Sequence, residues 1–193
     1  MTRDEHLIES CASSKLVFDG KILHVFVDDI HLPNGAMGFR EYIKHIGAGA
    51  VLPLTDDGCV VCVRQYRYAV GQVTLEIPAG KLDSAEENPQ DAVLRELREE
   101  TGARCKSLTY LGTYLASPAI LDEKINLYLA RGLDFGKTDP DDDEFIDVVQ
   151  IPLEEMVERV MRGEILDGKT QLAVLKVSEL LRREKTDGEG EKK

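Results

Sequence analysis

The 193-residue chain suits one domain with a small extension, and its 42% hydrophobic and 31% charged residues are the balance of an ordinary globular protein. The net charge of -12 argues against a general binder of nucleic acid or membrane surfaces, since both require a basic surface. A small anionic ligand remains compatible with this charge, because bound cations can invert the local field.

The first half of the chain reads as a series of short strands. Residues 15–46 are β-rich runs separated by turns at Asp19-Gly20 and at Pro33-Asn34-Gly35. Residues 48–69 read as two strands across the Asp57-Gly58 turn, and residues 73–80 add another short strand.

The spacing of helix signals predicts a helix over Pro89–Thr101. Asn88 is a good N-cap, Pro89 suits the first helical position, and Asp91 complements the positive helix N-terminus. Gly102 stands where a left-handed residue commonly ends a helix.

The second half mixes strands and helices, which favours a mixed α/β sandwich over a regular series of βαβ units. We expect strands near 107–114, 125–133 and 145–152, an acidic loop at 138–144, and helices at 152–162 and 170–183. The expected organisation is a β-rich extension over residues 1–45, a main domain over 46–184, and a disordered tail over 185–193.

The four cysteines do not suggest a zinc or redox site. Cys59 and Cys62 form a CxxC pattern, but a spacing of three along a strand places the two thiols on opposite faces. Ordinary core cysteine is therefore the better interpretation. With no signal peptide or apolar run of transmembrane length, the sequence favours a reducing cytoplasm.

The predicted helix carries an acidic cluster. Glu96, Glu99 and Glu100 share one helical face, and Arg95 is placed to pair with Glu99. Such a cluster is most often a solvated surface. However, carboxylates gathered in this way also suit Mg²⁺, which binds through a few carboxylates together with substrate phosphates.

The wider spacing favours the metal site, because this segment resembles the Nudix box, GX5EX7REUXEEXGU. Six residues instead of five separate Gly80 from Glu87, and the last position is the small Ala103. We assign the first glutamate to Glu87 and not Glu86, because a loop can absorb an insertion while the helical half stays in register. The matching residues are Gly80, Glu87, Arg95, Glu96, Leu97, Glu99, Glu100 and Gly102.

The resemblance implies a Nudix fold, which is an α/β/α sandwich with a mixed sheet, here preceded by an N-terminal antiparallel β extension. It also implies hydrolysis of a nucleoside diphosphate linked to another moiety, with Mg²⁺ or Mn²⁺. The implied metal ligands are Glu96, Glu99, Glu100 and the backbone carbonyl of Ala79, and Arg95 and Glu99 also enter the implied catalytic set.

Features outside the box resemble the ADP-ribose pyrophosphatase branch of the family. Pro118 lies sixteen residues after Gly102, and the flanking IPAGKLD and RQYRYA segments look similar to that branch. This resemblance implies hydrolysis of ADP-ribose to AMP and ribose 5-phosphate by a homodimer in which the N-terminal extension helps to build the partner's site.

The same resemblance suggests further site residues. Glu144 in the acidic loop is the expected catalytic base, with Asp142 and Asp143 as the alternatives. Arg67, Glu76, Arg40 and Pro118 are the expected substrate-binding residues. Four aromatic residues could stack on a base, and the sequence does not single one out: Phe39, Tyr42, Tyr66 and Tyr68.

Two other functions stay open at this point. The substrate could be another nucleoside diphosphate, such as a nucleotide sugar, NADH or a dinucleoside polyphosphate, because specificity resides in the pocket and not in the fold. A non-catalytic nucleotide-binding module on the same fold is a further alternative, although the acidic residues of the box are all present.

Overall fold

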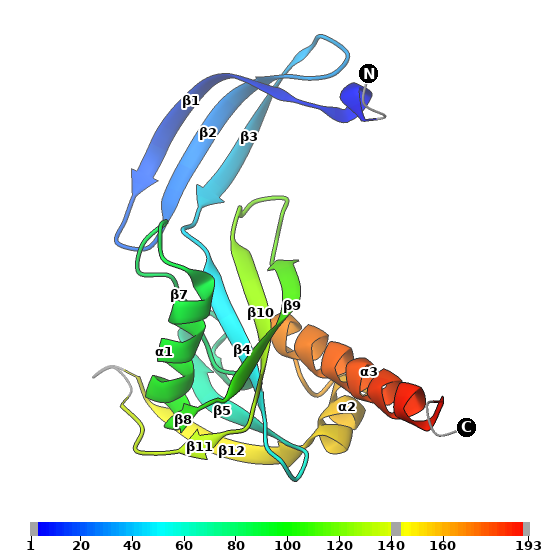
Figure 1. Ribbon diagram of the computed structural model, residues 1–193. Helices are drawn as coiled ribbons and strands as arrows, with labels where there is room; N and C mark the ends of the chain where they lie inside the picture. The colour runs from blue at the N-terminus through cyan, green and yellow to red at the C-terminus, as the bar shows by residue number, and fades with distance from the viewer. Residues whose placement is uncertain (1–3, 140–143, 191–193) are drawn as a thin grey trace. The chain divides into compact units, whose positions relative to one another are not determined.

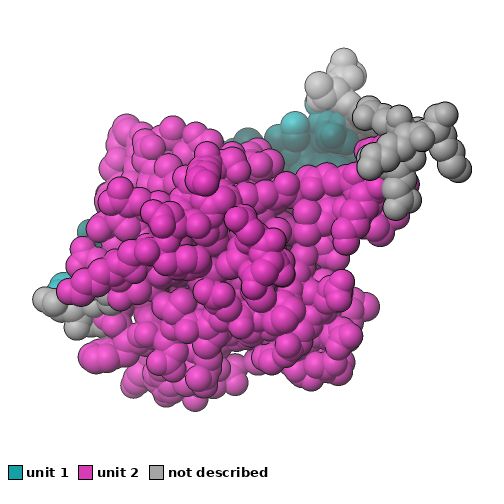
Figure 2. Space-filling view, turned by 60° about the horizontal axis from the view of Figure 1, so that its bottom comes forward, with its two compact units in different colours: residues 1–46, 115–123 teal, residues 47–114, 124–193 magenta. Residues whose placement is uncertain are grey.

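The computed structural model describes residues 4–139 and 144–190, which form two compact units (Figure 2). Unit 1 contains residues 1–46 and 115–123, and unit 2 contains residues 47–114 and 124–193. Each unit is described by itself.

Unit 1 is built on a three-stranded antiparallel sheet in the order β1-β2-β3 (Figure 1). A short 3-10 helix, η1 (Glu5–Leu7), precedes β1 (Ser10–Asp19), β2 (His24–His31) and β3 (Met37–Lys44). The strands and both turns confirm the pattern expected for this part of the chain. Gly35 has a φ of 83°, a backbone conformation that few other residues adopt in a turn.

The segment 115–123 joins unit 1 through backbone hydrogen bonds to the end of β3. Ile43 N donates to Ile120 O at 2.8 Å, and Asp122 N donates to Ile43 O at 3.2 Å. From the sequence, this segment is expected inside the main domain at 46–184. The compact units divide differently, because these contacts join residues distant along the chain.

Unit 2 contains a seven-stranded mixed sheet. Its main order is β12-β5-β4-β10-β9, with β6 paired to β5 and β7 paired to β4. The β4–β10 pair is parallel, whereas β5 pairs antiparallel with β4, β6 and β12. The strands are β4 (Ala48–Leu54), β5 (Cys59–Arg67), β6 (Gln72–Glu76), β7 (Ala79–Lys81), β9 (Ser107–Leu115), β10 (Lys124–Arg131) and β12 (Ile146–Pro152). A 3-10 helix, η2 (Tyr68–Val70), follows β5, and β8 (Ala103–Arg104) pairs with β11 (Asp134–Phe135).

Helices cover both faces of this sheet, which confirms the α/β/α sandwich. Alternate residues of a strand point to opposite faces, so neighbouring residues of β4 enter different hydrophobic clusters. Val51 packs in a cluster with Val93 of α1 (Pro89–Thr101). Leu52 belongs to the cluster that contains Met156 of α2 (Leu153–Met161) and Val174 of α3 (Gly168–Gly190).

The helix ends follow the sequence signals where those signals are local. Asn88 Oδ1 accepts from Gln90 N at 3.0 Å, and Gly102 has a φ of 71°, so the expected bounds of α1 are confirmed. α3 is longer than expected and continues through 185–190, a stretch that the sequence analysis assigned to a disordered tail. No helix within the described residues has an apolar stretch long enough to cross a membrane.

The expectation of an ordinary core cysteine is confirmed for Cys62. All four are free, and Cys62 is fully buried in the core while Cys59 is half-buried. Burial raises the pKa of the Cys62 thiol to about 12, so this thiol stays protonated at neutral pH. Such a thiol is a core residue and not a nucleophile.

Candidate active site

Glu100, near the C-terminal end of α1, is a buried carboxylate. It is only 3% exposed, and its Oε2 accepts one hydrogen bond, from Ala79 N at 3.2 Å. Burial, followed by the negative charges of Glu96 and Glu144, raises the pKa of Glu100 to about 8. A carboxylate in this environment favours a proton or a cation as its partner.

Glu96 lies one helical turn before Glu100 and approaches the backbone of Gly80. A Cβ atom added to Gly80 would lie 1.9 Å from Glu96 Oε1, so any other residue here would force the Glu96 side chain to move. Burial raises the pKa of Glu96, and the charges of Glu99 and Glu144 add to this effect against the opposing effect of Arg95. The box glycine is therefore required by space and not by a left-handed backbone conformation.

Arg95 provides positive charge to the two other glutamates of the cluster. Its Nη1 donates to Glu96 Oε1 at 2.8 Å and to Glu99 Oε2 at 3.2 Å. Glu99 Oε1 also accepts from Arg98 Nη2 at 2.9 Å. Glu99 thus has two arginine partners, whereas Glu100 has a backbone amide, and the three glutamates differ in how far their charge is compensated.

Glu86 and Glu87, in the loop before α1, could each match the first glutamate of the box, and the structure gives them different surroundings. Glu87 turns back into the loop, where its Oε2 accepts from Asp83 N at 2.5 Å and its Oε1 lies 3.9 Å from Arg95 Nη2. Glu86 is exposed. Glu87 therefore closes the loop and faces the box arginine, which supports its assignment over Glu86.

Glu144 lies near the acidic cluster, because its charge raises the pKa of both Glu96 and Glu100. It is half-buried and precedes β12. Glu144 thus lies close to the cluster without belonging to α1, and its role as a base stays a prediction. The alternatives, Asp142 and Asp143, lie outside the described residues.

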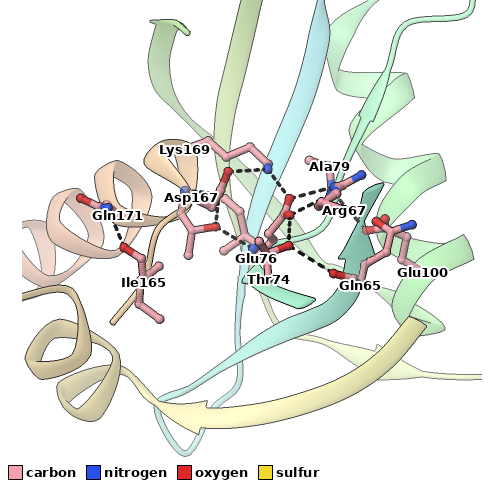
Figure 3. A network of polar contacts seen from close by, with 12 residues as sticks. Gln65, Arg67, Thr74, Glu76, Ala79, Glu100, Ile165, Asp167, Lys169 and Gln171 are labelled. Atoms are coloured by element: carbon pink, nitrogen blue, oxygen red, sulfur yellow. Dashed lines mark hydrogen bonds and ion pairs between the residues drawn. The ribbon is translucent and has the colours of Figure 1, made fainter. Parts of the chain in front are cut away.

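A polar network connects β5 and β6 with the start of α3 (Figure 3). The Glu76 carboxylate accepts from Arg67 Nε and Nη2, both at 2.8 Å, from Thr74 Oγ1 at 2.5 Å, and from Lys169 Nζ at 2.5 Å. Burial raises the pKa of Glu76, but the hydrogen bonds and charges of Arg67 and Lys169 outweigh it and hold the pKa well below its ordinary value. Glu76 is thus ionised.

Lys169 and Asp167, at the start of α3, are not among the site residues expected from the sequence. Asp167 Oδ2 accepts from Thr170 N at 2.9 Å, which caps α3, and Asp167 Oδ1 accepts from Lys169 Nζ at 2.9 Å. An aspartate three residues before a threonine at a helix start is a recognisable capping signal. The contact of Lys169 with Glu76 spans 93 residues and has no such local signal.

Two expected substrate-binding residues belong to unit 1. Arg40 pairs with Glu9 and donates to Phe39 O at 2.8 Å. Pro118 is exposed, in a turn of the segment 115–123. Arg67 and Glu76, in contrast, belong to unit 2 together with the acidic cluster.

The chemistry of the cluster fits a hard divalent cation. Oxygen ligands are what Mg²⁺ and Mn²⁺ prefer. Burial, together with neighbouring negative charges, raises the pKa values of Glu96 and Glu100, and a bound cation would stabilise their ionised forms. Within the part of the chain that the structure describes, no three His, Cys, Asp or Glu side chains are already gathered as a ligand set. Glu96 and Glu99 instead face Arg95, and Glu100 faces Ala79 N.

This sandwich, with the acidic helix α1 packed against the short strand β7 that contains Gly80, is the arrangement that the resemblance to the Nudix family predicts. The family profile described as NUDIX domain matches residues 43–170, and the chain therefore belongs to the Nudix hydrolase family.

Curated relatives support the same family over most of the chain. An ADP-ribose pyrophosphatase of Bacillus subtilis (strain 168) is 39% identical over 93% of this chain and 98% of its own length. A Methanol dehydrogenase activator of Bacillus methanolicus is also 39% identical, over 86% of this chain and 90% of its own. An ADP-ribose pyrophosphatase of Mycobacterium tuberculosis (strain ATCC 25618 / H37Rv) is 35% identical over 90% and 84%.

A solved structure confirms the fold. The protein titled "Crystal structure of ADP compounds hydrolase" superposes with a TM-score of 0.80 at 22% identity, covering 91% of this chain and 95% of that chain. Identity at this level speaks for the fold alone.

Proposed function

We propose that the protein hydrolyses the diphosphate of ADP-ribose to AMP and ribose 5-phosphate, with Mg²⁺ or Mn²⁺ as the cofactor. Water adds to one phosphorus, the bond from that phosphorus to the bridging oxygen breaks, and the leaving phosphate keeps that oxygen. The observation that carries the proposal is the buried Glu100, with a pKa of about 8, beside Glu96. The two ADP-ribose pyrophosphatases at 39% and 35% identity support the choice of substrate.

We assign metal binding to Glu96, Glu99, Glu100 and the carbonyl of Ala79. A divalent cation bound there would neutralise the diphosphate and favour ionisation of water. Ala79 N already donates to Glu100, so strand β7 and helix α1 are held together at the point where the ligands are needed. Arg95 holds Glu96 and Glu99 while no cation is bound, and this is its part in the catalytic set.

We assign the role of general base to Glu144, which takes a proton from the attacking water. The effect of its charge on the pKa of Glu96 and of Glu100 supports this assignment. We assign Arg67 to the diphosphate, because a guanidinium is suited to phosphate oxygens and the charge of Glu100 acts on it.

The proposal includes a homodimer in which unit 1 contributes Arg40 and Pro118 to the partner's substrate site. Three exposed hydrophobic residues of this unit, Phe18, Ile22 and Phe39, provide apolar surface for such an association. A cytoplasmic location is consistent with four free cysteines.

The test is hydrolysis of a substrate panel containing ADP-ribose, nucleotide sugars, NADH and diadenosine polyphosphates, with Mg²⁺, Mn²⁺ or chelator. We expect preferred turnover of ADP-ribose, with AMP released only when metal is present. Preference for another compound would retain the Nudix chemistry and refute the substrate. No turnover of any compound would favour the non-catalytic nucleotide-binding module.

Other relatives suggest which alternative substrates the panel should contain. GDP-mannose pyrophosphatases of Yersinia enterocolitica and Escherichia coli are 32% and 33% identical to this chain, so a nucleotide sugar is the strongest alternative substrate. The relative from Bacillus methanolicus is named as an activator of methanol dehydrogenase, and its identity equals that of the Bacillus subtilis enzyme. The complete set of box acids in this chain favours hydrolysis.

A further inference from the structure

The Glu76 carboxylate is saturated with donors from inside the protein. Its Oε1 accepts from Arg67 Nε and Thr74 Oγ1, and its Oε2 accepts from Arg67 Nη2 and Lys169 Nζ, all within 2.8 Å. A carboxylate has about four acceptor positions, so Glu76 has little capacity left for a ribose hydroxyl or a metal-bound water. The sequence suggested that Glu76 binds substrate. These contacts indicate instead that Glu76 holds the side chains of Arg67 and Lys169 in place.

Arg67 uses only one edge of its guanidinium on Glu76. Nε and Nη2 form the bidentate pair, whereas Nη1 bonds to neither oxygen of Glu76. The charge of Glu100 acts on Arg67, and Figure 3 shows Arg67 between Glu76 and Glu100. The remaining edge is therefore available to an anion that arrives beside the acidic cluster.

Lys169 shares Glu76 with Arg67. Its side chain is only 11% exposed, and Nζ lies 2.5 Å from Glu76 Oε2 and 2.9 Å from Asp167 Oδ1. Asp167 caps α3 through Thr170 N, and Ile77 N donates to Thr170 Oγ1 at 2.9 Å, so the start of α3 is fixed to the strand region that carries Glu76. The position of Lys169 is thus set by two elements.

The charges of this network balance. Arg67 and Lys169 carry two positive charges, and Glu76 and Asp167 carry two negative charges. Without the charge of Lys169 the network would have a net charge of about -1. The positive charge of Arg67 would then be fully compensated by Glu76. A diphosphate would then approach a negative site.

We propose that Lys169 is a positioning residue: it shares the carboxylate of Glu76 so that Arg67 keeps its orientation and its charge is only partly compensated where the diphosphate of the substrate binds. This inference rests on the proposed function for its substrate, but the contacts on which it depends involve no metal ligand. A purely structural role for Lys169, as a link between α3 and the sheet, is the alternative to be tested.

The experiment compares Lys169→Met, Lys169→Arg, Asp167→Asn and the double variant Lys169→Met/Asp167→Asn. Lys169→Met should raise KM for ADP-ribose about tenfold with a smaller change in kcat, because an interaction with the bound diphosphate is weakened. Lys169→Arg, which keeps the charge, should restore most of the affinity. The double variant should reverse much of the increase in KM that Lys169→Met causes, because it restores the charge balance.

Asp167→Asn alone is the matched control. Asparagine caps a helix about as well as aspartate, so the melting temperature of this variant should stay within a few degrees of that of the wild type. Its KM for ADP-ribose should fall, because the variant removes one negative charge from the network. The inference is overturned if Lys169→Met lowers only the melting temperature and leaves KM unchanged, or if the double variant recovers nothing.

A second readout separates this inference from the proposed function. Binding of inorganic pyrophosphate to the five proteins in the presence of chelator, measured by calorimetry, should follow the same order as 1/KM. If the wild type fails to hydrolyse ADP-ribose with metal present, the proposed function fails, and the pyrophosphate affinities still decide the role of Lys169. Equal pyrophosphate affinities for the wild type and Lys169→Met would refute the positioning role of Lys169.

Discussion

Replacing Glu100 by glutamine should stabilise the metal-free protein at alkaline pH and abolish metal-dependent turnover. The pKa of Glu100 is about 8 in the folded protein against an ordinary 4.5, so the folded state binds the proton more tightly than the unfolded state. A raised pKa of this kind gives stability that is complete below pH 4.5 and is lost as the pH rises through 8. Glutamine, which is neutral at every pH, avoids this loss.

The magnitude follows from the two pKa values. At about 1.4 kcal/mol per pKa unit, ionisation of Glu100 costs the fold at most about 5 kcal/mol. The stability of Glu100→Gln relative to wild type should therefore grow from about 2 kcal/mol at pH 6 to about 5 kcal/mol at pH 8.5, as upper limits. Saturating Mg²⁺ should reverse the order at pH 8.5, because the cation stabilises the wild type by binding its folded state.

Urea unfolding followed by circular dichroism in chelator measures this difference, since the chain has no Trp for fluorescence. Glu158→Gln is a suitable control, because the side chain of Glu158 is 70% exposed, and its stability difference from wild type should not grow between pH 6 and 8.5. Parallel stability curves for wild type and Glu100→Gln would refute the argument that Glu100 is an uncompensated buried charge. Near-normal turnover would remove Glu100 from the metal site.

Three further outcomes are expected. Gly80→Ala should weaken Mn²⁺ binding by about tenfold or more in a calorimetric titration, because its Cβ would displace Glu96 Oε1, and unchanged affinity would exclude Glu96 as a ligand. Glu144→Gln should lower kcat by about 100-fold or more with little change in KM, and an unchanged kcat would move the base elsewhere, for example to Asp142. Light scattering of a dilute solution should give twice the chain mass of 21.5 kDa, and a mass equal to one chain would contradict a site shared between subunits.

Local signals predicted the part of the fold that carries the acidic cluster. The ends of α1 are marked by residues next to them in sequence: the cap at Asn88, the proline after it, and Gly102. The structure has the helix between the same residues. The choice of Glu87 over Glu86 also followed from local reasoning, because a helix must keep its register and a loop need not. The geometry of the Glu87 contact with Asp83 N agrees with that reasoning.

Contacts between distant residues could not be predicted in the same way. The segment 115–123 joins unit 1 through hydrogen bonds to Ile43, although it lies in sequence between β9 and β10 of the other unit. Lys169 meets Glu76 across 93 residues, and a lysine near a helix start has no pattern that distinguishes a buried partner from solvent. α3 exceeded its expected end because a charged, glycine-containing sequence was taken for disorder, whereas the structure continues the helix through 185–190.

The acidic cluster shows why the residue types alone do not define the site. Glu96, Glu99 and Glu100 are the same side chain within five positions of one helix, yet each has a different partner. Glu99 bonds to two arginines. Glu96 bonds to one arginine and lies against Gly80. Glu100 is buried and accepts a hydrogen bond from a backbone amide. A cation would therefore relieve Glu100 most and Glu99 least, because the free energy gained depends on how much negative charge the protein leaves uncompensated. The like charges of the box are tolerated in part because Arg95 bonds to Glu96 and Glu99, whereas the buried Glu100 depends most on a proton or a metal.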